Sequence, residues 1–367
     1  MKIICSQKEL STAVNIVQKA VSTKTTLPIL KGILLEAKDD KLKLVGNDLD
    51  IGIENCIKTK TIKEGSVVIS SRLFGDIVRK LPSSDVEIEV DDHNNVFIRC
   101  ENSDFKLMGQ PAIEFPELPY VEEENSYIIG QDLFKNMIRQ TIFATSQDET
   151  RPILTGSLIE IEKKNISMVA IDGYRLAIRK AYLNTDIDNK AVIPSKTLNE
   201  INRILGNEAE GDIHISFTDK HILFTLDETR IISRLLEGEF INYLQIIPKE
   251  YKSRAKVSTK SLLDSIERAS LVAKEGKNNL IKFSIKDDIM DVSSNVEIGS
   301  VNEEVRIELE GEDLDIGFNS KYLLDALRVI DSEEIYLEFT TGVSPCIMKP
   351  ADNENYTYLL LPVRLSK

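Results

Sequence analysis

Hydrophobic and polar positions along the 367-residue chain follow one pattern three times. Each time an apolar strand ends in a polar step, an amphipathic helix follows, and an acidic strand comes next. The aligned serines are Ser71, Ser195 and Ser320, so the copies lie 124 and 125 residues apart. A repeat of this length predicts three similar domains in one chain.

Each copy also opens with a second helical segment, in which apolar residues recur at three and four positions. The six predicted helices span residues 8–24, 71–81, 131–147, 195–205, 259–277 and 320–330. Alternating apolar and polar residues between them predict roughly eight strands in each copy. The sequence therefore predicts an α+β fold of three repeated domains, 1–122, 123–253 and 254–367, each with two helices on antiparallel sheets.

Composition narrows the class of protein further. No run of 18 apolar residues occurs, and the first ten residues become polar too soon for a signal peptide, so we expect no membrane span and a cytoplasmic location. Cys5, Cys56, Cys100 and Cys346 are far apart and form no CxxC motif. They are predicted to be reduced and mostly buried.

Charge is divided unevenly between the predicted elements. The six helical segments carry a net charge of +8, which leaves −22 for the rest of a chain whose total is −14. One interpretation is that Lys and Arg simply favour helices, whereas Asp favours turns. The other is that the helices line one shared surface that meets a polyanion. The charge pattern alone leaves both open.

Catalytic and metal-binding patterns are absent from the sequence. The three histidines, His93, His214 and His221, have no neighbouring ligands at metal-site spacing, and no phosphate-loop, dinucleotide, zinc-protease or hydrolase motif occurs. We therefore expect no catalytic residue, no metal and no cofactor. The segment 172–175 (DGYR) is a polar cluster among apolar strands. It is either a β-bulge with a solvent-facing Arg175 or the rim of a recognition site.

Four short motifs, in order along the chain, carry a resemblance to a known family. They are residues 26–30 (TLPIL), 172–176 (DGYRL), 317–319 (GFN) with Tyr322, and 361–365 (LPVRL). Together with the repeat, they make the chain resemble the bacterial sliding clamps, the β subunits of DNA polymerase III. The resemblance implies a head-to-tail, ring-shaped homodimer that encircles duplex DNA without reading its sequence. It implies a non-catalytic processivity factor of DNA replication, associated with the nucleoid, which tethers the replicative polymerase and binds the clamp loader and other clamp-binding proteins.

The resemblance also implies a pocket for partner peptides between the second and third domains. Carried over position by position, it comprises Leu154, Ile171, Gly173, Tyr174, Arg175, Leu176, Ile246, Asn319, Tyr322, Val343, Leu359, Leu360, Leu361, Pro362, Val363 and Arg364. From the pattern alone, residues 359–361 are also compatible with an ordinary buried strand. Ile241 and Gln245 depart from the family, in which Pro and Arg are frequent at these positions.

Two further surfaces follow from the resemblance. Lys24 matches a basic DNA-contacting position of the family, and membership of the helices adds further DNA-facing residues. These are Arg72, Arg79, Lys80, Arg139, Lys196 and Arg203. The dimer interface would pair Phe105 and Leu107 of one chain with Leu271 and Val272 of the other.

A rival hypothesis is a monomeric, acidic scaffold of three repeats that binds proteins only. It predicts a particle of 41.4 kDa in solution, where the clamp hypothesis predicts twice that mass. An enzyme is the least favoured class, because no nucleophile, base or metal constellation was found.

Overall fold

The computed structural model describes residues 1–22, 24–123, 126–185, 188–206 and 211–365. The chain forms two compact units. Unit 1 comprises residues 1–132 and 203–235, and unit 2 comprises residues 133–202 and 236–367. The second copy of the repeat is therefore divided between the two units.

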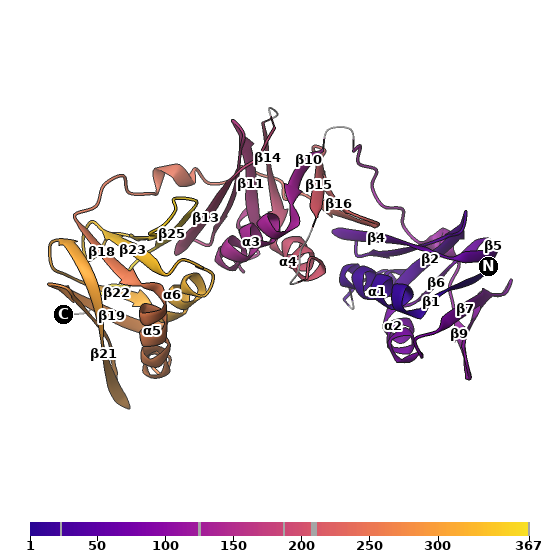
Figure 1. Ribbon diagram of the computed structural model, residues 1–367, viewed down its shortest axis with the longest axis horizontal. Coiled ribbons are helices and arrows are strands. Elements are labelled where there is room, and N and C mark those ends of the chain that lie inside the picture. The colour runs from indigo at the N-terminus through magenta and orange to yellow at the C-terminus, as the bar shows by residue number, and fades with distance from the viewer. Residues whose placement is uncertain (23, 124–125, 186–187, 207–210, 366–367) are drawn as a thin grey trace. The chain divides into compact units, whose positions relative to one another are not determined.

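Helices form in all six predicted segments (Figure 1). They are α1 (Gln7–Val17), α2 (Ser71–Lys80), α3 (Gln131–Thr141), α4 (Ser195–Ile204), α5 (Thr259–Ala273) and α6 (Ser320–Leu327). The three aligned serines begin α2, α4 and α6, which confirms the repeat. Several helices are shorter than predicted, and α1 and α3 pass into the 3-10 turns η1 (Gln18–Ala20) and η4 (Ile142–Ala144). Tightened last turns of this kind are common at helix ends.

Unit 1 contains two antiparallel sheets, with strand orders β5-β1-β7-β8-β9 and β10-β15-β16-β17-β4-β3-β2-β6. Their strands are β1 (Lys2–Ser6), β2 (Gly32–Lys38), β3 (Lys41–Asn47), β4 (Ile51–Lys58), β5 (Lys60–Lys63), β6 (Gly65–Ser70), β7 (Asp85–Val90), β8 (Asn95–Cys100), β9 (Ser103–Met108), β10 (Tyr127–Gly130), β15 (Asp212–Phe217), β16 (His221–Leu226) and β17 (Thr229–Arg234). Helices α1 and α2 pack together beside these sheets (Figure 1). Leu10, Val14 and Val17 form the buried face of α1, at the spacing that predicted it.

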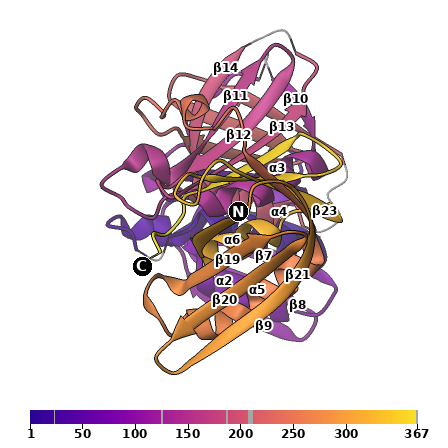
Figure 2. The ribbon, with the colours of Figure 1, turned by 90° about the vertical axis from the view of Figure 1, so that its left-hand side faces the viewer.

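Unit 2 contains a twelve-stranded antiparallel sheet, ordered β14-β11-β12-β13-β25-β24-β23-β18-β21-β20-β19-β22. Its strands are β11 (Gly156–Glu162), β12 (Asn165–Ile171), β13 (Arg175–Tyr182), β14 (Asn189–Pro194), β18 (Ser253–Ser258), β19 (Leu280–Lys286), β20 (Ile289–Val296), β21 (Gly299–Gly311), β22 (Leu314–Asn319), β23 (Glu334–Phe339), β24 (Cys346–Pro350) and β25 (Tyr356–Leu360). Figure 2 shows β19, β20 and β21 as a layer in front of α5. Apolar residues of α5, such as Leu262 and Ile266, are fully buried in the same core cluster as Phe283 of β19.

Neighbouring copies of the repeat share their sheets. In unit 1, β17 of the second copy pairs with β4 of the first, with Ile231 opposite Ile53. In unit 2, β25 of the third copy pairs with β13 of the second, with Tyr358 opposite Ala177. We call these pairings the first seam and the second seam. They join strands that are about 180 residues apart in the sequence. Closing so long a loop costs conformational entropy, and local sequence patterns do not reveal which strands will pair.

The four cysteines are free, and three of them are buried, as predicted; Cys56 is half-buried. Burial raises the pKa of the Cys5 thiol to about 12, so this thiol stays protonated and unreactive near neutral pH. Within the described ranges of the chain, no helix is long and apolar enough to cross a membrane.

Candidate peptide groove at the second seam

The turn between β12 and β13 positions the polar cluster predicted from the sequence. The Asp172 carboxylate accepts hydrogen bonds from the backbone N–H groups of Tyr174 and Arg175, at 2.9 and 3.1 Å. Gly173 has a φ of +96°, a conformation that glycine adopts without the steric cost of a Cβ atom. The turn directs Tyr174 outward, with 61% of its surface exposed, whereas only 7% of Arg175 is exposed.

Arg175 is the centre of a buried polar network. Its guanidinium donates hydrogen bonds to the carboxylates of Asp172 and Asp325, at 3.0 and 2.6 Å, and to the carbonyl of Phe143 at 2.6 Å. The same group stacks over the ring of Tyr322, 4.4 Å from its centroid. The interpretation of Arg175 as a solvent-facing residue of a bulge is therefore wrong. The neighbouring Asp172, the distant Asp325 and the carbonyl of Phe143 bind it and keep it buried.

The surroundings of Arg175 keep its guanidinium protonated. Burial acts to lower its pKa, but interactions with Tyr358, Asp325 and Asp172 outweigh that effect and raise it. Burial also raises the pKa of the Tyr322 hydroxyl, so this tyrosine is neutral at physiological pH. The network is therefore a fixed positive group enclosed by two carboxylates and aromatic rings.

A buried apolar cluster lies beside this network. Leu154, Ile171, Leu176 and Leu359 belong to one buried cluster, and Leu176 lies directly opposite Leu359 across the second seam. The interpretation of residues 359–361 as a buried strand is right for the first two residues, and their role in a pocket stays a prediction. Leu359 and Leu360 are buried strand residues at 2% exposure, whereas Leu361 lies beyond the strand and is 37% exposed.

The C-terminal segment closes one side of the groove. The Leu361 N–H donates to the Tyr174 carbonyl at 2.9 Å, and the Val363 N–H donates to the Gly317 carbonyl at 2.8 Å. Pro362 between them is half-buried, and Arg364 is exposed. The segment thereby connects the turn at Tyr174 with the strand that leads into α6.

Helix α6 supplies the opposite side. The Asn319 side chain accepts from the Lys321 N–H and caps the helix, which places Tyr322 in its first turn. The ring of Tyr322 stacks on that of Tyr174, with centroids 6.2 Å apart. A cavity of about 490 Å³ opens here and is lined by both tyrosines, Arg175 and Asp325. Asp148, Arg151 and Lys321 also line it, so the cavity is mostly polar, and the leucines of the buried cluster are not among its lining residues.

Two predicted pocket residues are less closely tied to this centre. Val343 is 75% exposed on a turn, Ile246 is 38% exposed, and no described contact joins either one to Arg175 or Tyr322. The prediction also missed Phe143 and Asp325, which contact Arg175 directly. Asp325 follows Tyr322 by three positions, so the two share one face of α6; this spacing was the only available signal.

The predicted DNA-facing residues lie on or next to the helices of their own unit. Lys24, Arg72, Lys80, Lys196 and Arg203 are exposed. Two others are already engaged within the chain: Arg79 pairs with Asp76 at 2.5 Å, and Arg139 pairs with Asp331 at 2.5 Å. Their charge is therefore partly neutralised at short range.

The predicted dimer residues are apolar and accessible. Phe105 is 37% and Leu271 is 59% exposed, and Leu107 and Val272 are half-buried. Near Leu271 on the same helix, Arg268 pairs with Glu303 of β21 at 2.5 Å. In the part of the chain that the structure describes, no group of three or more His, Cys, Asp or Glu is placed to hold a metal ion.

Three helix-and-sheet copies, in which neighbouring copies share a sheet, define the class of DNA clamps. Sequence comparison gives the same result. The N-terminal, central and C-terminal domain models of the DNA polymerase III beta subunit match residues 1–119, 128–242 and 244–364. The chain therefore belongs to the DNA polymerase III beta subunit family, the beta sliding clamps.

Individual relatives cover the whole chain. The beta sliding clamp of Bacillus subtilis is 42% identical over 99% of this chain and 100% of its own length. A crystal structure of the DNA polymerase sliding clamp from the same species superposes with a TM-score of 0.97 at 40% identity, with both chains fully covered. A sliding clamp of Pseudomonas aeruginosa, solved bound to griselimycin, has a TM-score of 0.94 at 26% identity, with both chains again fully covered.

Proposed function

We propose that two copies of this chain close head to tail into a ring around duplex DNA. The ring acts as a non-catalytic processivity factor in the cytoplasm, at the nucleoid, and tethers the replicative polymerase and other clamp-binding proteins. The observation that carries the proposal is a pair of open strand edges. Among the described strands, β9 pairs only with β8, and residues 299–306 of β21 pair only with β20.

The two open edges match the strands that already form seams. Ser103 begins β9 after a tight turn just as Thr229 begins β17, so Phe105 corresponds to Ile231. In the first copy, strand pairing leads from Ser71 through β6, β2 and β3 to β4. In the third copy it leads from Ser320 through β22, β19 and β20 to β21, and Val301 then stands at the position of Ile53. Because Ile231 lies opposite Ile53 in the first seam, Phe105 would lie opposite Val301 of a second copy. Three seams per chain, the third between chains, generate a closed ring.

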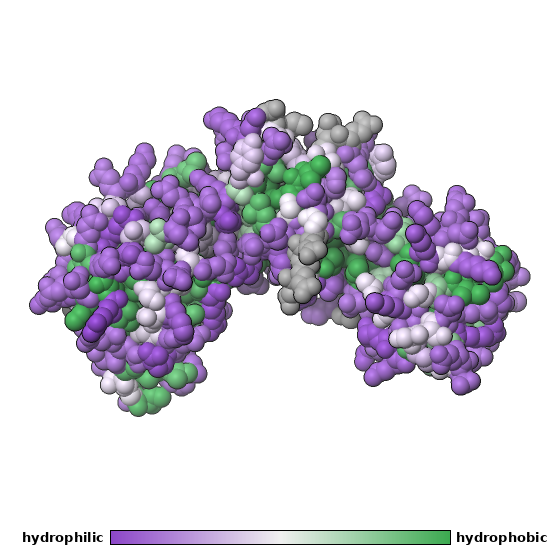
Figure 3. Space-filling view, viewed as in Figure 1, coloured by the Kyte–Doolittle hydropathy of each residue, from purple (hydrophilic) through white to green (hydrophobic). Residues whose placement is uncertain are grey.

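Exposed apolar side chains support this third seam. Figure 3 shows apolar residues at its lower left, where the β20–β21 hairpin ends. Ile298 at the hairpin turn is 77% exposed, and Leu271 on α5 is 59% exposed. Together with Phe105, Leu107 and Val272, they offer an apolar interface core, and fully burying one such side chain contributes about 1.5–3 kcal/mol.

DNA would be held by topology rather than by strong contacts. The chain carries −14 overall, so its outer surface would repel DNA. Modest positive charge would come from Lys24, which follows the first helix, and from the exposed helix residues Arg72, Lys80, Lys196 and Arg203. Binding that depends on many phosphate contacts falls steeply with salt and opposes sliding. A ring with few such contacts keeps the duplex enclosed and mobile.

Partner proteins would dock in the groove at the second seam. A short peptide would place apolar side chains against Tyr174 and Tyr322 beside residues 361–364, above the buried cluster of Leu154, Leu176 and Leu359. Polar groups of the peptide would meet Tyr322 and the exposed Arg151, because the guanidinium of Arg175 already binds Asp172, Asp325 and the Phe143 carbonyl. Interfaces of this kind depend on a few apolar or aromatic anchors seated in a pocket.

Light scattering coupled to gel filtration tests the ring. We expect a dimer for the wild-type chain and folded monomers for Leu271→Ala combined with Val272→Ala. Leu73→Ala, at an exposed leucine of α2, is the matched control and should remain dimeric. A double variant that stays fully dimeric at submicromolar concentration would contradict this interface. A wild-type monomer of 41.4 kDa would instead favour the protein-binding scaffold.

Retention on DNA tests the function itself. After loading by a clamp loader, the protein should stay on closed circular DNA and leave once the circle is cut. Equal retention on circular and linear DNA would rule out encirclement.

A further inference from the structure

Three exposed apolar side chains stand where the third seam would end. Leu73 on α2 is 48% exposed, Met108 at the end of β9 is 87% exposed, and Ile298 in the turn between β20 and β21 is 77% exposed. Leu73 and Met108 belong to unit 1, and Ile298 belongs to unit 2. The proposed pairing of β9 with β21 of a second copy would bring the three positions together.

The second seam shows which residues stand at such an end. Tyr358 lies opposite Ala177, and three positions further along the strands the Leu361 N–H donates to the Tyr174 carbonyl at 2.9 Å. Leu361 is 37% and Tyr174 is 61% exposed, although this seam is formed. Strand pairing therefore leaves the side chains of these two positions open to solvent, at the edge of the proposed peptide groove.

The first seam has the same backbone pairing but charged side chains. Ile231 lies opposite Ile53, and three positions further along the strands the Arg234 N–H donates to the Asp50 carbonyl at 2.9 Å. The side chains of Arg234 and Asp50 are both exposed. Water solvates charged side chains well, so this end of the first seam is stable without a partner.

The same count gives the end of the third seam. Three positions along the strands from Phe105 and Val301 stand Met108 of one copy and Ile298 of the other. Since the two formed seams leave these positions exposed, both apolar side chains would stay exposed in the closed ring. Exposed apolar side chains that adjoin one another mark interaction surfaces.

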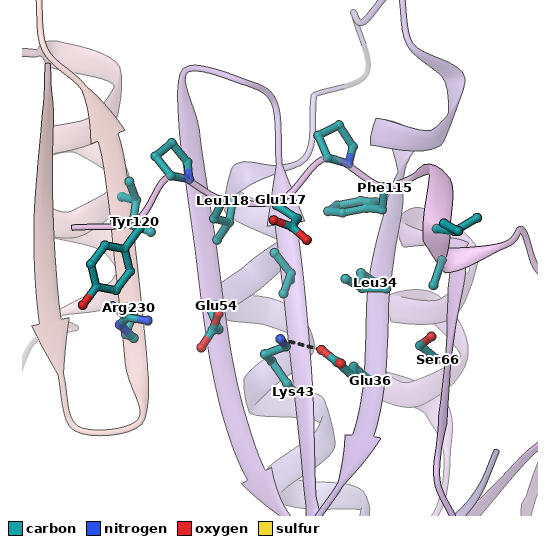
Figure 4. Close-up of a pocket in the computed structure, with 16 residues that line it drawn as sticks. Leu34, Glu36, Lys43, Glu54, Ser66, Phe115, Glu117, Leu118, Tyr120 and Arg230 are labelled. Carbon is teal, nitrogen blue, oxygen red and sulfur yellow. Dashed lines mark ion pairs between the residues drawn. The ribbon is translucent and has the colours of Figure 1, made fainter. Parts of the chain in front are cut away.

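Unit 1 also repeats the segment that closes the groove of unit 2. Gln110 exchanges two backbone hydrogen bonds with Val68 of β6, at 2.8 and 3.0 Å, and it thereby takes the place of the last residue of segment 361–363. The chain beyond Gln110 is anchored by Phe115, which is buried and lies against the strands in Figure 4. Met108 is therefore held between β9 and an anchored segment.

Helix α2 supplies a further apolar side chain at this end. Leu73 is the third residue of α2, as Tyr322 is the third residue of α6. The buried charge of the second seam is not repeated, because Gly299, which follows Ile298, stands at the position of Arg175. The end of the third seam therefore favours apolar side chains over charged ones.

We propose that the end of the third seam is a second docking site, which takes a short segment of a partner protein with two neighbouring large apolar residues. The proposal rests on the ring proposed above, because Ile298 comes from one copy and Leu73 and Met108 come from the other. One apolar side chain of the partner lies between Met108 and Ile298, and the next lies on Leu73. The site is absent from the monomer, whereas the groove at the second seam is complete within one chain.

Methyl NMR of the full-length protein with the probe acetyl-Ser-Leu-Phe-Ser-amide tests the proposal. In the dimer, we expect saturable shifts of the methyl signals of Leu73, Met108 and Ile298. In the monomeric double variant of α5, binding at these three residues should be weaker by about tenfold or more, because the site has lost one of its sides. The shifts of Leu361 at the second seam should remain.

A second variant tests the site while the ring stays closed. Met108→Ser combined with Leu73→Ser should weaken binding by about tenfold or more, measured from the Ile298 signal, because apolar anchors carry most of the binding energy of such contacts. The matched control is Leu49→Ser combined with Ile128→Ser. It removes side chains that are 57% and 53% exposed in the β3–β4 turn and on β10. It should leave the affinity within about twofold, because distant sites rarely couple.

Light scattering on the same samples separates this proposal from the ring itself. A monomeric wild-type protein would overturn both, because the docking site needs two copies. In a dimeric protein, the docking site alone is overturned if the three methyl signals show no saturable shift. It is equally overturned if the control weakens binding as much as the Met108 variant, or if the shifts persist unchanged in the monomeric variant.

Discussion

The two seams within the chain end in turns of similar backbone conformation, but the side chains at these turns differ. At the first seam, Asp48 accepts hydrogen bonds from the backbone of Asp50 and Ile51, just as Asp172 does from Tyr174 and Arg175 at the second. Both turns contain a residue with positive φ. The repeat therefore preserves the turn that ends a seam, and the residues after the aspartate decide whether that end becomes a docking site.

The largest expected effect comes from removing the charge that distinguishes the second seam. Arg175→Met should cost about 3–5 kcal/mol of unfolding free energy, because Asp172 and Asp325 would lose their buried partner. Urea unfolding measures this loss. Arg151→Met is the control, since its pair with Asp148 is half-exposed and is worth less than about 1 kcal/mol. Similar losses in both variants would mean that the Arg175 network adds nothing to stability.

Removing the C-terminal segment should separate docking from assembly. Deletion of residues 361–367 is expected to weaken binding of a polymerase-derived clamp-binding peptide by about a hundredfold or more, because one side of the groove disappears. The protein should remain dimeric, since Phe105 and Leu271 are untouched. Fluorescence anisotropy and light scattering report the two properties. Deletion of residues 366–367 alone, which lie outside the described residues, is the control and should change neither.

Exchanging residues at the positive-φ positions tests whether the two turns are equivalent. Gly173→Leu should destabilise unit 2 by about 1–2 kcal/mol, because a side chain is disfavoured at this φ. Leu49 has a φ of +78° and is 57% exposed, so Leu49→Gly relieves a similar strain and should leave stability unchanged or slightly higher. A loss of more than about 1 kcal/mol in Leu49→Gly would show that packing, not backbone strain, governs the first turn.

The smallest effect concerns the aromatic residue that covers the sheet of unit 2. Tyr243→Phe removes the hydrogen bond to Glu160 and should cost about 0.5–1.5 kcal/mol, because Lys190 still pairs with that carboxylate at 3.3 Å. Thermal unfolding detects this change. Tyr182→Phe, at an exposed tyrosine of the same unit, is the control and should be neutral. Equal effects in the two variants would show that the hydrogen bond from Tyr243 to Glu160 adds nothing to stability.

Local patterns predicted the elements well, because helix faces and strand alternation are short-range properties. The residues that begin α2, α4 and α6 could be read directly from the aligned serines. The environment of Arg175 could not. Its partner Asp325 lies 150 residues away, and only the pairing of β13 with β25 brings the third copy next to the second. The same limit explains why Phe143 was missed, since its carbonyl and its ring, whose centroid lies 5.3 Å from the guanidinium, come next to Arg175 only in the folded chain.

The shared sheets also mean that sequence repeats and folding units do not coincide. A fragment ending at residue 122 would contain the first copy but would lack β17, the partner of β4. The open edge of β4 would then present unpaired backbone groups between Ile51 and Asn55, and such edges favour aggregation. A fragment that ends at residue 235 keeps β17 next to β4 but takes β25 away from β13, so no single cut between the repeats leaves every seam strand with its neighbour.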